Sequence, residues 1–481
     1  MASNLALIGI IVWVVRQKQN DSADYFLGGR DATWLAIGAS IFASNIGSEH
    51  LIGLAGAGAS SGMAMAHWEI QGWMILILGW VFVPFYSRSM VYTMPEFLER
   101  RYNPQSRTIL SVISLVSYVL TKVAVTVYAG GLVFQQVFGI KELWGIDFFW
   151  IAAIGLVVLT ALYTIFGGMK SVLYTSVLQT PILLLGSLII LVLGFKELGG
   201  WDEMMRVCGA VTVNDYGDTM TNLIRSNDDA NFPWLGALIG SAIIGFWYWC
   251  TDQFIVQRVL SGKNEKEARR GTIFGAYLKL LPVFLFLIPG MIAFALHQKY
   301  IGAGGEGFLP MLANGTANAD AAFPTLVAKL LPAGVKGLVV CGILAALMSS
   351  LASLFNSSAM LFTIDFYKRF RPETPEKKLV GIGQIATVVI VILGILWIPI
   401  MRSVGDVLYT YLQDVQSVLA PGIAAAFLLG ICWKRTSAQG GMWGLIAGMI
   451  IGLTRLGAKV YYSNAGEVAD STFKYLFYDM N

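Results

Sequence analysis

The feature that most constrains this sequence is a succession of apolar runs, each long enough to cross a lipid bilayer as a helix. A spanning helix needs about 20 predominantly apolar residues. Eleven such runs lie at about 34–59, 63–87, 108–138, 146–166, 170–195, 234–257, 271–297, 334–364, 379–401, 404–433 and 438–460. Because hydrocarbon offers no hydrogen-bond partners, each run must satisfy its own backbone groups. We therefore expect an all-α protein that crosses the membrane many times.

The composition agrees with this expectation and excludes other classes. Hydrophobic residues make up 56% of the chain and charged residues 13%, whereas soluble domains carry about 25% charged residues. Cys250, Cys341 and Cys432 fall in apolar runs and Cys208 stands alone in a polar loop, a pattern unlike a disulfide framework or a metal cluster. The sequence contains no phosphate-cradling loop, zinc spacing or nucleophile–base motif, so we do not expect an enzyme.

The loops between the runs alternate in charge, and this sets the orientation. Basic residues gather in stretches such as 100–107, 263–270 and 368–378, whereas the long loop 196–233 is acidic. The positive-inside rule places the basic loops in the cytoplasm. We expect the acidic loop and the loop 298–332 to lie outside, in a multi-pass protein of the plasma (cytoplasmic) membrane.

Two of the runs carry polar groups at mid-membrane depth. The first holds the stretch Phe42 to His50, which includes an amide, a carboxylate and an imidazole, and the sixth holds Phe246 to Gln253. An unpaired polar group in hydrocarbon costs several kcal/mol, so such clusters must face a cavity or a partner. We expect the helix to be broken at each cluster.

The two interrupted runs occupy corresponding places in the chain. Each opens a set of five runs, and because five is odd the second set enters the membrane from the opposite side. Interrupted helices in corresponding positions of inverted halves indicate the binding site of a secondary transporter. The carbonyls freed at a break, together with the negative end of a helix, suit a cation.

A run of small residues from Ala345 to Ser353 gives a second signal for a cation. The hydroxyls of Ser349 and Ser350 offer oxygen ligands without a buried charge, which suits a monovalent ion such as Na⁺, whereas a divalent ion prefers carboxylates. The alternative is that both hydroxyls bond back to their own helix.

At these residues the chain resembles the sodium/glucose cotransporters of the solute:sodium symporter family. The resemblance covers essentially the whole chain. The motifs that carry it are Asp24 to Arg30, Gly38 to Gly58, Tyr92 to Phe97, Trp247 to Arg258, Tyr277 to Leu280, Met348 to Asn356, Pro421 to Leu429 and Trp433 to Arg435. It implies a LeuT-like fold, an inverted five-plus-five helix repeat with peripheral helices.

On that fold the chain divides into five segments. They are residues 1–32 (the remnant of an N-terminal peripheral helix and a cytoplasmic loop), 33–196 (the first five-helix repeat), 197–233 (an extracellular loop), 234–433 (the second, inverted repeat) and 434–481 (a peripheral C-terminal helix with a truncated end).

The resemblance also implies a sugar site and its gates. The matching substrate positions are Asn45, His50, Glu69, Tyr248, Trp249, Lys279 and Gln413; Tyr248 also matches the inner gate, and Leu54, Trp68 and Tyr409 match the outer gate. A hexose needs donors and acceptors around its rim and a flat apolar surface against its C–H face, which these side chains offer. The alternatives are purely structural roles: Glu69 and Lys279 pair with each other, His50 is a core histidine whose hydrogen bonds are satisfied, and Trp249 serves only in packing. Asp252, Gln257 and Arg258 also match family residues, and we assign them to structure on the cytoplasmic side.

The implied sodium site combines the backbone carbonyls of Ala43, Ile46 and Ala346 with the hydroxyls of Ser349 and Ser350. One departure concerns a second sodium ion. Two-sodium members carry Tyr-Thr-Asp where this chain reads Tyr174-Thr175-Ser176, and Ala352 replaces a hydroxyl after the serine pair. We therefore predict one Na⁺ per sugar.

Together these features predict Na⁺-coupled symport of a glucose- or galactose-type hexose by alternating access, with Na⁺ as coupling ion and no organic cofactor. The alternatives are symport of myo-inositol or another polyol, and a sugar-gated sensor that does not accumulate its ligand. The lipid bilayer is the expected surrounding, and nothing in the sequence calls for a nucleic acid or a required protein partner.

Overall fold

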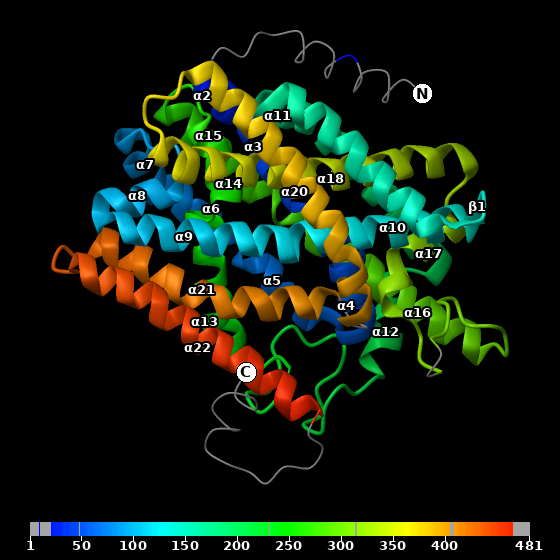
Figure 1. Ribbon diagram of the computed structural model, residues 1–481. Coiled ribbons are helices and arrows are strands. Elements are labelled where there is room, and N and C mark those ends of the chain that lie inside the picture. The colour runs from blue at the N-terminus through cyan, green and yellow to red at the C-terminus, as the bar shows by residue number, and fades with distance from the viewer. Residues whose placement is uncertain are drawn as a thin grey trace.

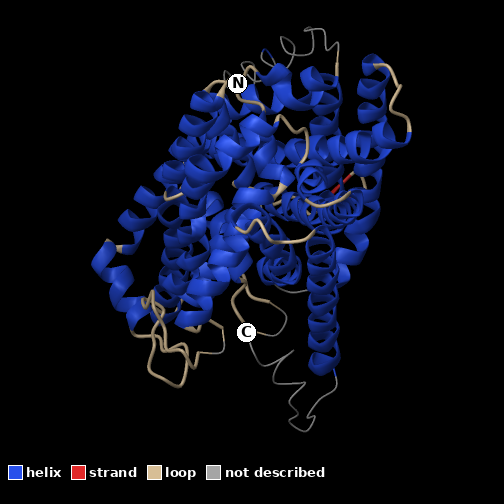
Figure 2. Cartoon of the chain, turned by 90° about the vertical axis from the view of Figure 1, so that its left-hand side faces the viewer, coloured by secondary structure: helices blue, strands red, loops and turns tan. Residues whose placement is uncertain are grey.

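The computed structural model describes residues 9, 21–47, 49–229, 231–312, 315–404 and 408–464. This part of the chain is helical almost throughout, as Figure 2 shows. Its one small sheet pairs β1 (Glu142–Leu143) with β2 (Ile146–Asp147) in antiparallel register. The predicted helix remnant, Asn4 to Val15, lies outside the described residues except for Gly9, and so does the chain beyond residue 464.

The α-helices follow one another around the bundle drawn in Figure 1. In the first half they are α2 (Ser22–Leu27), α3 (Trp34–Asn45), α4 (Ala55–Ser61), α5 (His67–Ile70), α6 (Met74–Ile77), α7 (Val83–Ser89), α8 (Met94–Arg101), α9 (Pro104–Ser117), α10 (Ala124–Phe138), α11 (Phe148–Leu198) and α12 (Trp201–Gly209). In the second half they are α13 (Trp234–Gly245), α14 (Gln253–Leu260), α15 (Glu265–Leu278), α16 (Ile288–Gly302), α17 (Ala322–Leu330), α18 (Ala333–Met360), α19 (Lys368–Phe370), α20 (Glu376–Val404), α21 (Leu408–Cys432) and α22 (Ala438–Asn464).

Short turns of tighter or wider helix join many of these elements. The π-helical turns are η2 (Glu49–Leu54), η5 (Leu78–Phe82), η6 (Tyr118–Val123), η7 (Phe246–Thr251), η8 (Val283–Leu287) and η10 (Leu361–Tyr367). The 3₁₀ turns are η1 (Gly28–Arg30), η3 (Gly62–Ala66), η4 (Gln71–Trp73) and η9 (Ala319–Ala321). Because π turns concentrate at functional sites, those beside the two polar clusters, η2 and η7, matter most.

Within the described residues, eight helical stretches are long and apolar enough to cross a membrane. The sequence predicts eleven runs, and the numbers differ for two physical reasons. The stretch Phe148–Leu198 holds two runs, joined at Gly168 by a non-helical turn with φ 53°. The first and third runs are divided by helix irregularities, so that α3 and α10 are each too short to count alone.

The first interrupted helix runs through the core of the bundle. In α3 every residue from Ala36 to Asn45 is buried, and the helix packs against α11, α15 and α18. Close approach to α15 depends on glycine: a Cβ at Gly38 would lie 2.8 Å from the carbonyl oxygen of Gly271. Small residues at a crossing let membrane helices approach closely. Around this core, α21 and α22 pack side by side on one flank (Figure 1).

The loop between α12 and α13 rests on the turn that follows α4. The N–H of Met63 donates to the carbonyl of Met220 (2.8 Å), and the Arg225 guanidinium donates to the carbonyl of Ser61. A Cβ at Gly62, where φ is 73°, would lie 2.1 Å from the Met220 carbonyl oxygen. The loop therefore lies directly on the turn between the first and second runs.

Candidate solute and cation site

The first polar cluster breaks its helix, as the sequence predicts. Ile46 leaves the helical region (φ −79°, ψ 86°) after α3. The N–H of Gly47 donates to the carbonyl of Asn45 (3.0 Å), and so turns away from the Ala43 carbonyl that a continuous helix would pair with it. The chain resumes as η2, in which the N–H of His50 donates to the Gly47 carbonyl (3.2 Å). At the break the Ala43 carbonyl thus loses the N–H partner that it would have in a continuous helix.

The second polar cluster also breaks its helix. After η7, Asp252 adopts an extended backbone conformation (φ −72°, ψ 127°). Its carboxylate then caps α14 by accepting from the N–H of Phe254 (3.2 Å). An N-terminal acidic cap is favourable because it pairs a free N–H and faces the positive end of the helix.

The structure brings six of the seven predicted substrate residues together. Their side chains are all buried, and they come from α3, η2, α5, η7 and the end of α15: Asn45, His50, Glu69, Tyr248, Trp249 and Lys279. The side chain of the seventh, Gln413, lies outside the described residues.

Lys279 is at the centre of this cluster. Its ammonium lies 2.7 Å from Glu69 Oε2, donates to Asn45 Oδ1 (2.6 Å) and is 2.7 Å from His50 Nε2. The same His50 nitrogen lies 3.1 Å from Glu69 Oε1. Since one ring nitrogen cannot both accept from Lys279 and donate to Glu69, its partner depends on the tautomer. The cluster therefore holds donors and acceptors that can rearrange around a polar solute.

The sequence also allowed Glu69 and Lys279 to pair only with each other, and the structure contains this ion pair. It does not separate the two interpretations, because a solute hydroxyl can bond to both members of such a pair. His50 is not fully satisfied: its Nδ1 has no hydrogen-bond partner within the described part of the chain. A buried nitrogen without a partner is costly unless a ligand or water supplies one.

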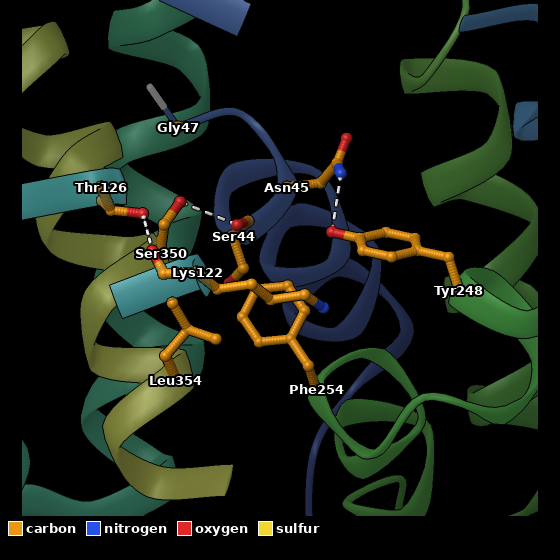
Figure 3. A pocket seen from close by; sticks show the side chains of 9 residues that line it. All are labelled: Ser44, Asn45, Gly47, Lys122, Thr126, Tyr248, Phe254, Ser350 and Leu354. Atoms are coloured by element: carbon orange, nitrogen blue, oxygen red, sulfur yellow. Dashed lines mark hydrogen bonds between the residues drawn. The ribbon is translucent and has the colours of Figure 1, made fainter. Parts of the chain in front are cut away.

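Two aromatic rings lie beside this polar cluster. The Lys279 ammonium is 5.5 Å from the ring centre of Trp249, which packs edge-on against Tyr248 at 4.9 Å. The Tyr248 hydroxyl accepts from Asn45 Nδ2 (3.0 Å), as Figure 3 shows. The residue predicted for the inner gate and a residue predicted for the substrate site are therefore in direct contact.

Of the residues that match the outer gate, Leu54 is fully buried in η2 and Trp68 is half-buried in α5. The side chain of Tyr409 lies outside the described residues.

The serine pair faces the first break. Ser350 Oγ donates to the carbonyl of Ser44 (2.8 Å), and a Cβ at Gly47 would lie 2.8 Å from that same hydroxyl oxygen. Ser349 Oγ lies 3.5 Å from Ser44 Oγ and 3.2 Å from Ser176 Oγ. Neither contact is a bond to its own helix, so the alternative raised for the pair is not what the structure shows. Both hydroxyls instead join α18 to the neighbouring helices.

A family model described as the Sodium:solute symporter family matches residues 25–448. The chain belongs to this family. It is therefore a multi-pass membrane protein that couples Na⁺ to a solute, and not an enzyme.

Curated relatives agree with this family. Human sodium/myo-inositol cotransporter 2 is 38% identical over 466 residues, which cover 94% of this chain and 68% of that protein. The sodium/myo-inositol cotransporter of Canis lupus familiaris is 39% identical over 474 residues, covering 94% and 65%. The predicted family is thus confirmed, although these relatives are named for myo-inositol and not for glucose.

Solved structures show the fold. A Na⁺-coupled sialic acid symporter in a substrate-bound outward-open state aligns with TM-score 0.74 and 21% identity, covering 94% of this chain and 98% of that one. MhsT in complex with L-phenylalanine aligns with TM-score 0.54 and 13% identity, covering 88% and 96%. The expected all-α, LeuT-like fold is confirmed.

Sequence reasoning did not single out Lys122 in this symporter. The residue lies in η6, is buried, and its ammonium is 2.6 Å from Asp252 Oδ2. A signal was present, because an ionisable residue inside an apolar run marks a functional position by default. The structure also places Asp252, which the sequence assigns to the cytoplasmic side, in the second break, where its partner Lys122 lies 4.6 Å from the ring centre of Tyr248.

Proposed function

We propose that this symporter uses the inward movement of Na⁺ to accumulate a small, neutral, polyhydroxylated ring, with myo-inositol as the first candidate. The observation that carries the proposal is the buried cluster around Lys279, which presents several donors and acceptors beside two aromatic rings. The names of the curated relatives support myo-inositol over the hexose that the sequence resemblance favours.

The charges of the cluster favour a neutral solute. Glu69 and Lys279 form a buried pair of opposite charges at 2.7 Å. A charged solute would leave one of these groups without compensation, which is expensive in a buried site. Hydroxyl groups can accept from the ammonium and donate to the carboxylate without adding charge. A ring with hydroxyls around its rim therefore matches this site.

A hexose is the second candidate. The Trp249 and Tyr248 rings provide an apolar surface with a polar edge, and this suits the C–H face of a pyranose as well as that of a cyclitol. Discrimination between the two rings would depend on which hydroxyls meet His50, Glu69 and Gln413, because a site built to bond a hydroxyl rejects an analogue that lacks it.

For the coupling ion, we propose the carbonyls of Ala43, Ile46 and Ala346 with the hydroxyls of Ser349 and Ser350. The turned-away N–H of Gly47 and the position of Ser350 against the Ser44 carbonyl support this set. All five groups are neutral oxygens, as a weakly held monovalent ion requires.

We further propose a stoichiometry of one Na⁺ per solute. Ser176 Oγ lies 3.2 Å from Ser349 Oγ and donates to Ser40 Oγ (3.4 Å). Ser40 Oγ in turn accepts from Nε of the buried Arg258 (3.1 Å). These hydroxyls form a chain that leads to the positively charged guanidinium of Arg258, and no carboxylate takes part in it. Such a chain is a poor site for a second cation.

The two ligands meet on one helix break, which gives a basis for coupling. Ala43 and Ile46 offer carbonyls to Na⁺, whereas Asn45 and His50 face the solute. In the proposed repeats, 33–196 and 234–433, this break lies near the start of the first. Na⁺ that orders the break also orders the solute site, so each ligand should raise the affinity for the other by the same factor.

The test is uptake into proteoliposomes of labelled myo-inositol, glucose and galactose, each with and without an inward Na⁺ gradient. The expected result is Na⁺-dependent uptake of myo-inositol above the external concentration. Faster Na⁺-dependent uptake of glucose or galactose than of myo-inositol would identify a hexose, the second candidate, as the substrate. Solute binding or a solute-induced current without accumulation of the solute would instead support the alternative of a sugar-gated sensor.

A further inference from the structure

A buried ion pair joins the second break to the middle of the helix made of α9, η6 and α10. Lys122 and Asp252 are 3% and 5% exposed, and Lys122 Nζ lies 2.6 Å from Asp252 Oδ2. The Tyr118 hydroxyl donates to the other carboxylate oxygen, Asp252 Oδ1. Taking two charges out of water requires close geometry and further hydrogen bonds, and the pair has both.

The ammonium of Lys122 is also surrounded by aromatic rings. It lies 4.6 Å from the ring centre of Tyr248, 4.9 Å from Phe254, 5.1 Å from Tyr118 and 5.5 Å from Trp247. A carboxylate with several ring faces is the kind of site that binds free ammonium ions. The second break thus contains a cation site, and a side chain of the protein fills it.

The same lysine adjoins the proposed sodium site. A cavity of about 10 Å³, space for about one water molecule, is lined by Lys122 and Thr126 of the third run, by Ser44, Gly47 and Ser350 from the sodium side, and by Asn45 and Tyr248 from the solute side. Figure 3 shows the Lys122 side chain extending from the side of Ser350 and Thr126 toward that of Tyr248. The tethered cation and the exchangeable cation are therefore neighbours across one small space.

A second buried cation lies in the same region. Arg258 is 1% exposed, and its guanidinium is 4.9 Å from the ring centre of Phe254, which the Lys122 ammonium also approaches. Asp252 is thus the carboxylate that offsets positive charge beside the sodium site. A unit charge within about 10 Å of an ion site changes the binding constant on the order of tenfold at an effective dielectric constant of about 20.

We propose that Asp252 and Lys122 are positioning residues that set the Na⁺ affinity of the first break from the second. Asp252 neutralises the Lys122 ammonium so that Na⁺ can bind beside it. This inference rests on the sodium site of the proposed function and adds to it a charge pair at the second break that controls how tightly Na⁺ binds.

The proposal predicts effects of opposite sign for the two partners. Asp252→Asn leaves an unpaired ammonium beside the site and should weaken Na⁺ binding about tenfold or more. Lys122→Met removes a repelling charge and should leave Na⁺ binding as tight as in the unchanged protein, or tighter. The double variant Lys122→Met/Asp252→Asn should regain most of the affinity that Asp252→Asn loses. A pair that only supports the fold would weaken binding in both single variants.

The experiment uses the purified full chain in detergent, without solute. The melting temperature is measured against NaCl concentration, with choline chloride keeping the ionic strength constant, because a ligand that binds only the folded protein at concentration c stabilises it by RT ln(1 + c/Kd), so that the curve yields the Kd for Na⁺. If Lys122→Met does not fold, the comparison of Asp252→Asn with the double variant decides alone, since replacing both members of a buried pair is much better tolerated than removing one.

A matched control is the pair of half-buried Arg107 and buried Asp365, in which Arg107 Nε donates to Asp365 Oδ1 (2.8 Å). Asp365→Asn should lower the melting temperature without changing the Kd for Na⁺ obtained from this measurement. Weaker Na⁺ binding in Lys122→Met, or a double variant as weak as Asp252→Asn, would overturn the proposal. If Ser350→Ala keeps normal Na⁺ binding, it is the sodium site of the proposed function that fails.

Discussion

Both interrupted helices of this symporter expose polar groups inside the bundle, and the two breaks stabilise these groups with different chemistry. The first break is surrounded by backbone carbonyls, hydroxyls and a glycine, at Ser44, Gly47 and Ser350. The second is held by a full ion pair, Lys122 with Asp252, inside a group of aromatic rings. Neutral oxygens leave a place that an ion can enter and leave, whereas the ion pair fills its place permanently. The comparison teaches that one break is suited to an exchangeable cation and the other to a fixed one.

The largest effect is expected at the first break. Ser350→Ala removes a hydroxyl that contacts the Ser44 carbonyl and should abolish the stimulation of uptake by Na⁺, a loss of at least tenfold in Na⁺ affinity. Uptake measured against Na⁺ concentration in proteoliposomes checks this. Ser358, also on α18, has a buried hydroxyl with no partner within the described residues, so Ser358→Ala is the matched control and should transport normally.

The next effect separates solute from cation at the same break. His50→Ala removes a ring within hydrogen-bond distance of Lys279 and Glu69. It should weaken solute binding about tenfold, the worth of one or two hydrogen bonds, and leave Na⁺ binding within about twofold. Gln413→Ala should behave alike. Equilibrium binding of labelled solute and of Na⁺ measures both. His67→Ala, at a half-buried histidine at the start of α5, should change neither.

A smaller effect tests why glycine stands at the first break. An alanine at Gly47 would bring its Cβ within 2.8 Å of Ser350 Oγ, so Gly47→Ala should lower Na⁺ affinity severalfold by displacing that hydroxyl. Gly155 in α11 has no atom within 4 Å of such a Cβ. Gly155→Ala should instead stabilise the protein by about 0.5–1 kcal/mol. Equal losses of Na⁺ affinity in both variants would contradict the role of Gly47.

The smallest effect concerns Asp320 of η9, which packs against the part of the first interrupted helix that follows the break. Asp320 packs against Gly56 of α4, and burial raises the pKa of its carboxyl from 3.8 to about 6. Between these values the folded protein binds more protons than the unfolded chain, so stability falls as the pH rises from about 4 to about 6. Asp320→Asn should remove this dependence and stabilise the protein at pH 7. Melting temperatures at pH 4.5 and 7 check it, and a decrease at pH 7 would contradict it.

Sequence reasoning placed both breaks correctly because a polar cluster in an apolar run has few alternatives in a membrane. Asn45, His50, Glu69 and Lys279 were also predicted to share one site. That prediction came from the family resemblance and not from the spacing of these residues in the sequence. The partner of Lys122 could not be read from the sequence, because 130 positions separate it from Asp252. An isolated lysine shows that a counter-ion is required but not where the fold supplies it. The roles of Tyr409 and Gln413 stay predictions.

On the proposed stoichiometry of one Na⁺ per solute, which rests on the hydroxyl of Ser176, the energy of a single ion limits how far a cell can concentrate its solute. One Na⁺ entering down a tenfold gradient yields about 1.4 kcal/mol, and a membrane potential of 100 mV adds about 2.3 kcal/mol. Their sum sustains a concentration ratio of roughly 500, and a second ion would square it. With one ion per turnover, each solute molecule draws half as much Na⁺ into the cell, so the symporter is matched to a solute that is scarce but not extremely dilute.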